Sequence, residues 1–100
     1  MAKGGTGGGE PGRCIFFQVG RFTEFFGRQA RMACRLFGCA VRQGRWPGVP
    51  QCGFPVRMLK RYKDKARRLG LSYVVIAEHG YTAAGLKRRL VTEKLTFVEG

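Results

Sequence analysis

Residues 14–26 carry the pattern that decides the fold, Cys-Ile-Phe-Phe-Gln-Val followed by Gly-Arg-Phe-Thr-Glu-Phe-Phe. The first part is short, apolar and rich in residues that favour strands, and a glycine follows it. We therefore predict a buried strand over Cys14–Val19. From Phe22 to Leu36, apolar residues recur every three or four positions, which is typical of one face of a helix. This spacing predicts a helix with Thr23 as its N-terminal cap and Gly38 at its end.

The next part of the chain predicts a short strand, a loop and a second helix. The strand is expected over Cys39–Arg42, and the loop after it leaves Trp46 exposed or half-buried. The segment Gly53–Pro55 predicts a turn into the second helix, with Pro55 near the first helical position and Gly70 beyond the last. The apolar stripe of this helix is predicted to be Met58 or Leu59, Tyr62, Ala66 and Leu69.

The last third of the chain predicts strands. Leu71–Ala77 is a nearly continuous apolar run, which indicates a strand that is buried on both faces and lies centrally in its sheet. Arg89–Val98 alternates in part and predicts one or two further strands. The order strand, helix, strand, helix, strand, strand predicts an α/β fold, with a single domain built on a mixed β-sheet flanked by helices.

The charge of the chain is strongly unbalanced. There are 19 Lys and Arg against 6 Asp and Glu, which gives a formal net charge of +13. Such an excess costs stability through self-repulsion, so it indicates a polyanionic partner, and nucleic acid is the leading candidate. No apolar run is long enough to cross a bilayer, and the start of the chain has no apolar signal region. We therefore expect no membrane partner and a cytoplasmic protein, associated with the nucleoid if it is bacterial.

Residues 1–12 are rich in glycine and contain no large apolar side chain. Such a segment cannot bury enough surface to offset the entropy lost on ordering. We predict a flexible tail or linker over residues 1–12, a DNA-binding domain over residues 13–100, and a place for this domain in a longer chain or assembly.

The sequence offers little for catalysis. No two of its four cysteines have the two-residue separation that places two thiolates on one metal ion, so we expect reduced, core-filling thiols and neither metal nor cofactor. A nuclease would have to use Glu24, Glu78 and His79. Glu78 and His79 are adjacent at the end of a predicted strand, where neighbouring side chains point to opposite faces. We therefore do not expect an enzyme.

Six segments, taken together, carry a resemblance to a known family. They are Phe16–Gly20, Phe22–Phe26, Gly53–Pro55, Lys65–Gly70, Tyr73–Glu78 and Arg88–Thr92. The first two look like the family's Phe-Phe-x-x-Gly and Phe-x-Glu-Phe-Phe elements, and the last is similar to its closing Arg-x-Val-Thr. In order and spacing the segments resemble the N-terminal mismatch-recognition domain, domain I, of the MutS DNA mismatch-repair family, over roughly residues 13–100.

The resemblance implies a non-catalytic DNA-binding module that reads mispaired or unpaired bases. Phe22 matches the aromatic wedge that stacks on the defective base from the minor groove, and Glu24 matches the carboxylate that hydrogen-bonds to that base. Unstacking costs least where pairing is already defective, so a wedge selects deformable sites. The cations expected to hold backbone phosphates are Arg21, Arg28, Arg57, Lys60, Arg61, Lys63, Arg67 and Arg68.

The chain also departs from the family pattern. Arg21 stands where the family usually has Asp, and Thr23 stands where it usually has Tyr. The family's clamp, lever and ATPase domains have no counterpart in these 100 residues. An alternative function is therefore a general electrostatic adaptor that binds duplex DNA, hybrid duplexes or RNA without mismatch selectivity. A structural alternative is that the phenylalanines of residues 22–26 lie at helical spacing because they fill the core.

Overall fold

The computed structural model describes residues 12–98. Its elements, in chain order, are the strands β1 (Cys14–Val19) and β2 (Phe22–Phe26), the helix α1 (Arg28–Phe37), the strands β3 (Arg42–Gln43) and β4 (Pro50–Pro55), the 3-10 turn η1 (Val56–Met58), the helix α2 (Leu59–Arg68), and the strands β5 (Tyr73–Tyr81) and β6 (Lys87–Leu95). The predicted tail over residues 1–12 lies, apart from Gly12, outside the described residues.

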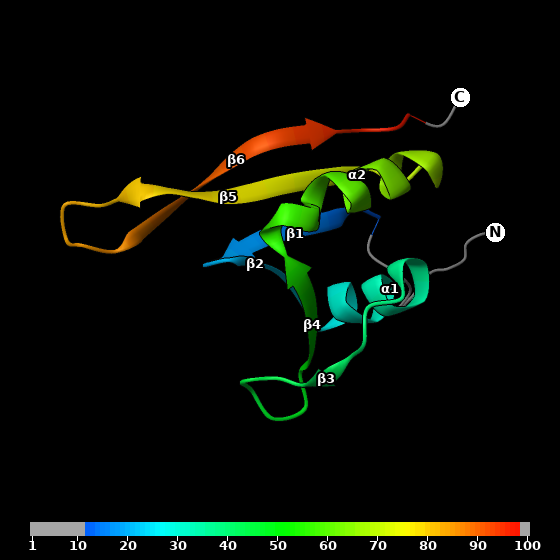
Figure 1. The fold of residues 1–100 in the computed structure, drawn as a ribbon, viewed down its shortest axis with the longest axis horizontal. Helices are drawn as coiled ribbons and strands as arrows, with labels where there is room; N and C mark the ends of the chain where they lie inside the picture. Colours follow the sequence, from blue (N-terminus) through cyan, green and yellow to red (C-terminus); the bar gives the residue numbers. More distant parts are fainter. Residues whose placement is uncertain (1–11, 99–100) are drawn as a thin grey trace.

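The strands form one mixed sheet in the order β3-β4-β2-β1-β5-β6. β1 and β5 run parallel, and all other neighbours in this sheet run antiparallel. A parallel pair needs a long crossover connection, which the chain from β2 through α2 supplies. β5 lies between β1 and β6, as its apolar run predicts. The β5–β6 hairpin extends well beyond the rest of the sheet (Figure 1).

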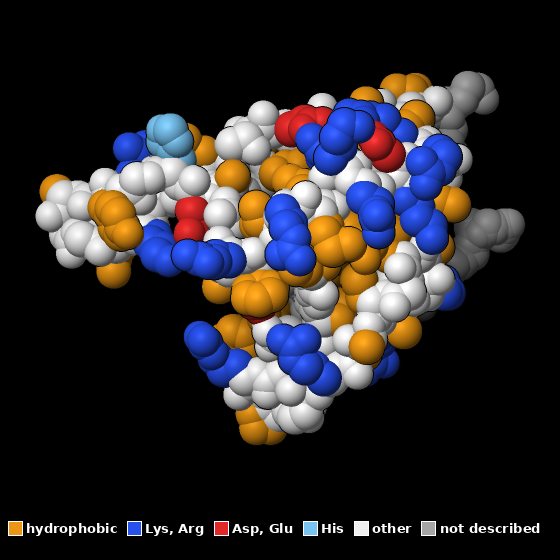
Figure 2. Space-filling model, viewed as in Figure 1, with side chains coloured by type: hydrophobic (Ala, Val, Ile, Leu, Met, Phe, Trp, Pro, Cys, Tyr) orange, Lys and Arg blue, Asp and Glu red, His pale blue; other side chains and the backbone are white. Residues whose placement is uncertain are grey.

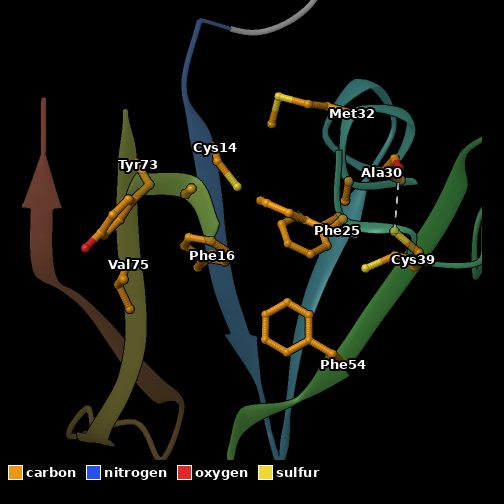
Figure 3. Close-up of a cluster of buried hydrophobic side chains, with 13 residues drawn as sticks. Cys14, Phe16, Phe25, Ala30, Met32, Cys39, Phe54, Tyr73 and Val75 are labelled. Carbon is orange, nitrogen blue, oxygen red and sulfur yellow. Dashed lines mark hydrogen bonds between the residues drawn. The ribbon is translucent and has the colours of Figure 1, made fainter. Parts of the chain in front are cut away.

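The two faces of the sheet differ because successive side chains of a strand point to opposite sides. The helix-covered face packs against both α1 and α2, and the strand side chains in its core are Cys14, Phe16, Phe25, Cys52, Phe54, Tyr73 and Val75. Figure 3 shows several of these side chains converging with Ala30 and Met32 of α1. From α2, Tyr62 stacks on Phe54 with ring centroids 4.0 Å apart. The opposite, helix-free face carries Ile15, Phe17, Val19, Phe22, Glu24, Phe26 and Gln51.

The predicted helix over Phe22–Leu36 is wrong in its first part. Residues Phe22–Phe26 form strand β2, and the helix begins only at Arg28, after Gly27 has turned the chain with φ 59°. Thr23 is therefore not a helix cap. Its side chain is 2% exposed and faces the core from β2, next to Phe25 at 1%. Burial alternates with a period of two along this segment, a pattern that the helical spacing of its phenylalanines concealed.

Three smaller predictions also differ from the structure. The short strand predicted over Cys39–Arg42 forms instead at Arg42–Gln43. Gly53–Pro55 is the end of strand β4 and not a turn, because a Cβ on Gly53 would lie 2.5 Å from the Thr23 carbonyl oxygen of the neighbouring strand. Glycine is needed there for the close approach of β4 to β2. Leu69 is 49% exposed and does not join the apolar stripe of α2.

Other predictions are confirmed. β1 has the predicted bounds, and Gly38 ends α1 in the left-handed conformation with its N–H bonded to the Cys34 carbonyl. Pro55 immediately precedes η1 and Gly70 follows α2. Trp46 is 50% exposed. The fold is the predicted single α/β domain, with a mixed sheet and two helices.

Candidate nucleic-acid interface

Phe22 and Glu24 lie on the same face of β2, since they are two residues apart on one strand. Phe22 begins the strand and is 49% exposed, between Val19 of β1 and Pro55 of β4. Glu24 is half-buried further along the helix-free face. Phe22 is therefore not a core residue, so the structural alternative suggested by the helical spacing is wrong for this ring.

Glu24 differs from the other acids of the described chain. Asp64 and Glu93 pair with cations of α2, and Glu78 pairs with Lys87 and Arg89. Within residues 12–98, Glu24 forms no such ion pair, and its Oε1 accepts a hydrogen bond of 2.5 Å from the neutral amide Nε2 of Gln51. Its charge is thus left uncompensated on the helix-free face.

The turn that carries Phe22 is fixed from both neighbouring strands. The Glu78 carboxylate accepts a hydrogen bond from the Gly20 N–H at 2.8 Å, and the Arg21 carbonyl accepts one from Val56 N–H at 2.8 Å. The bond from Gly20, together with the charges of Lys87 and Arg89, holds the pKa of Glu78 below its usual value. Glu78 is therefore a support for the turn, and the structure gives it no catalytic geometry with His79, which is exposed.

The predicted phosphate contacts fall into two groups. Lys63 and Arg67 are tied into the molecule, because both pair with Glu93, at 2.6 and 3.2 Å, and these contacts lower the pKa of Glu93. Lys60 pairs with Asp64 at 3.0 Å while its own side chain stays 85% exposed. The exposed predicted cations that form no ion pair within residues 12–98 are Arg21, Arg28, Arg57, Arg61 and Arg68.

The predicted site residues do not gather at one point. Arg21 and Arg57 lie close to Phe22, because η1 begins beside the β1–β2 turn. Arg28 follows the opposite end of β2, and α2 lies over the helix-covered side of the sheet. Figure 2 shows Lys and Arg side chains spread widely over that side, with acidic side chains at few places. The structure thus presents a broad basic surface with Phe22 near one end of the sheet.

Sequence reasoning missed a second set of residues on the helix-free face. Trp46 packs edge-on against Phe26 with ring centroids 5.7 Å apart, and the Arg89 guanidinium lies 4.9 Å from the centre of the Phe17 ring. Together with Glu24 these residues line a pocket of about 280 Å³. The alternation of Phe17 and Glu24 with buried neighbours is the signal that would have found this face, once residues 22–26 are read as a strand.

The structure offers no metal site or membrane span within residues 12–98. No group of three or more His, Cys, Asp or Glu side chains there is placed to hold a metal ion. The four cysteines are free thiols, and burial raises the pKa of both Cys14 and Cys52 to about 12, so these two stay protonated. Neither helix of the described chain is long and apolar enough to span a bilayer.

Comparison with known proteins places the chain in a family. The family model for MutS domain I matches residues 10–97. The DNA mismatch repair protein MutS of Thermus caldophilus is 33% identical over 90 residues, which are 86% of this chain and 11% of that protein. The proteins of the same name from Thermus aquaticus and from Rhodopseudomonas palustris (strain BisB18) are 32% and 30% identical, over 86% and 84% of this chain and over 11% and 10% of their own lengths. The chain thus spans about a tenth of the length of these relatives, and it belongs to the MutS domain I family.

Proposed function

We propose that this domain is a non-catalytic DNA-binding module that recognises mispaired or unpaired bases, with Phe22 as the wedge and Glu24 as the hydrogen-bond acceptor for the base. It works as one part of a longer chain or assembly. The observation that carries this proposal is the position of the two residues: they lie on one face of one strand, with the Phe22 ring half-exposed at the end of the sheet. A wedge and its hydrogen-bonding partner need this common direction.

The state of Glu24 supports its role. A carboxylate near DNA is repelled by phosphates, and most acids of a basic protein are expected to be paired with cations. Glu24 is paired only with the amide of Gln51, which orients Oε1 without neutralising the charge. The other oxygen, Oε2, is left to accept a hydrogen bond from a base edge.

The rigid setting of Phe22 supports the role of a wedge. Inserting an apolar side chain between base steps costs a few kcal/mol of unstacking, and this cost falls at a defective pair. A ring that moved freely would lose part of that gain as side-chain entropy. Here the Phe22 backbone is paired with strands on both sides, and the preceding turn is held by Glu78 and by Val56.

The test is fluorescence anisotropy with labelled DNA duplexes that are matched, carry a G·T mismatch or carry one extra base. We expect a several-fold preference for the two defective duplexes and affinities that fall steeply with salt. Phe22→Ala should remove the preference and keep most of the salt-dependent binding. The matched control is Phe97→Ala, which removes another exposed phenylalanine, 42% exposed and outside the sheet, and should leave the preference unchanged.

A second candidate function has an observation of its own. The unpaired cations are spread over both helices and the β1–β2 turn rather than gathered around Phe22. This spread suits an adaptor that binds nucleic acids by charge alone, including RNA. Equal affinity for all three duplexes and for an RNA hairpin, with no effect of Phe22→Ala, would establish the adaptor function and overturn mismatch recognition.

A further inference from the structure

The helix-free face contains a groove that neither Phe22 nor the phosphate-binding cations use. Its walls are the rings of Phe17, Phe26 and Trp46, which come from β1, β2 and the loop before β4. Trp46 stands against Phe26 at 5.7 Å between ring centroids, with the two planes inclined by 63°. We name these three rings, with Glu24 and Gln51, the aromatic groove.

The polar groups of the aromatic groove lie together. Glu24 and Gln51 both line the pocket of about 280 Å³ and are joined by their hydrogen bond. Gln51 is 9% exposed, and its Oε1 also accepts a hydrogen bond from the Arg45 N–H at 3.3 Å. The groove therefore combines flat apolar walls with a fixed carboxylate that has one oxygen still available.

Two cations stand at the edge of the aromatic groove. The Arg45 guanidinium lies 5.7 Å from the centre of the Trp46 ring, and the Arg89 guanidinium lies 4.9 Å from that of Phe17. Arg89 is also held by the Glu78 carboxylate at 3.2 Å and by the Gln18 carbonyl at 2.9 Å. A ligand of the groove is thus expected to carry an aromatic, hydrogen-bonding part and a negative charge beside it.

We infer that the aromatic groove binds a single unpaired nucleobase that has been displaced from the duplex, with Arg45 and Arg89 contacting its flanking phosphates. A nucleobase offers a π-face to the rings and an N–H edge to Glu24, and its phosphates complement the two cations. The volume suits one base, since it lies at the small end of the range of about 300–1,000 Å³ for small-molecule sites. This inference rests on the proposed function, because Phe22 would displace the base.

The position of the aromatic groove relative to Phe22 fits that sequence of events. Glu24 is two residues from Phe22 along β2, which is about 7 Å in an extended strand. A base pushed out at Phe22 would therefore need to move only about the spacing of two base pairs to reach the groove. Without such a site, three half-exposed rings beside an uncompensated carboxylate would have no evident role in stability.

The experiment uses Trp46 as a reporter, because it is the one tryptophan of the chain. Its fluorescence is measured while the protein is titrated with a single-base-bulge duplex or with the matched duplex, and the anisotropy of the labelled DNA is followed in parallel. We expect the bulged duplex to quench Trp46 strongly, and the matched duplex to quench it little at equal occupancy. Phe26→Leu, which removes a ring of the groove and keeps an apolar side chain, should reduce the quenching and weaken bulge binding about fivefold or more.

Tyr81→Leu is the matched control, since it also removes one ring, 66% exposed, but at the end of β5 away from the groove. It should leave the quenching unchanged. If Phe26→Leu fails to fold, Phe17→Leu repeats the test from β1. Preferential binding of the bulge with no Trp46 quenching would overturn the groove and leave the proposed function standing. Quenching by the bulge that persists when Phe22→Ala abolishes mismatch preference would support the groove and restrict the wedge.

Discussion

The two faces of the sheet are made by the same strands, yet they have opposite properties. On the helix-covered face, Phe16 is 1% exposed and its ring meets four other aromatic rings at centroid distances of 5.6–6.2 Å. On the helix-free face, the next residue, Phe17, is half-buried and has the Arg89 guanidinium over its ring. One face excludes water, and the other exposes rings together with charged groups.

The comparison shows how a small domain divides its tasks. With 100 residues it can build one core, and both helices are used to cover a single face of the sheet. The aromatic residues left on the other face are not needed to close that core. A row of half-exposed rings is what binding to stacked or displaced bases requires. The alternation of the strands thus separates stability from binding.

The largest expected effect comes from truncating one ring on each face. Phe16→Ala should lower the free energy of unfolding by about 3–5 kcal/mol, because it removes the centre of the aromatic core and leaves a cavity. Phe17→Ala should cost only about 1 kcal/mol, as its ring is half-exposed. Urea unfolding of both variants measures the difference. Equal losses would mean that the helix-free face is a second core and would break the comparison.

The next effect concerns Gly53, where the two faces share one backbone. Gly53→Ala places a Cβ 2.5 Å from the Thr23 carbonyl oxygen, so β4 and β2 must move apart. We expect a loss of about 2 kcal/mol of stability in urea unfolding. Because Gly53 lies opposite Glu24, the same variant should weaken DNA binding.

Gly12→Ala is the control for Gly53→Ala, since no atom lies within 4 Å of the Cβ position of Gly12. It should change the stability by less than about 0.5 kcal/mol. A similar small change for Gly53→Ala would show that the strands adjust to each other without cost, and that glycine there has no packing role.

Most of the fold follows from the sequence because local signals agree with the tertiary structure. The apolar run of β5 and the glycine after α1 each have one structural meaning, and both are confirmed. Phe22–Phe26 is different. Its aromatic residues satisfy a helical spacing and a strand alternation equally well, and only pairing with β1 and β4 selects the strand. Such pairing joins residues far apart in the chain, so no local pattern reveals it.

The candidate site was predictable only in part for the same reason. Phe22 and Glu24 are found by resemblance to a family motif, which does not depend on the secondary structure assigned to them. The aromatic groove joins Phe17, Trp46 and Arg89 from three separate segments, and its existence depends on the absence of a helix over this face within residues 12–98. The number of cations was evident from the sequence, but their pairing was not, since Lys63 and Arg67 meet Glu93 only in the fold.

A smaller effect is expected from the polar pair of the helix-free face. Gln51→Leu removes the hydrogen bonds to Glu24 and to the Arg45 N–H. Since Glu24 can turn to water, we expect a loss of about 1 kcal/mol in stability, and a larger relative loss of affinity for a bulged duplex. Gln43→Leu, an exposed glutamine on β3, serves as the control for the change in side-chain type. A large loss of stability with unchanged DNA binding would assign Gln51 to the fold rather than to the site.

The smallest expected effect is a pH-dependent one at the edge of the helix-free face. Glu78 has a lowered pKa because its carboxylate accepts the Gly20 N–H bond and faces Lys87 and Arg89. A carboxyl whose pKa is lower in the folded state stabilises the fold above its ordinary pKa of 4.5, and this contribution is lost as the pH falls through the lowered value. Glu78→Gln should therefore melt below the wild type near pH 7, and the two melting temperatures should converge by about pH 3.

Thermal melts of wild type and Glu78→Gln across this range measure the effect. A gap that stays constant down to the acid end would mean that Glu78 acts through its shape and hydrogen bonds rather than its charge. Convergence would mean that its charge fixes the turn before Phe22 and holds Arg89 over Phe17. In that case mismatch preference should weaken in Glu78→Gln even at neutral pH, where the core of the helix-covered face is intact. One carboxylate would then link the two faces, contributing little to stability while it fixes the geometry of the binding surface.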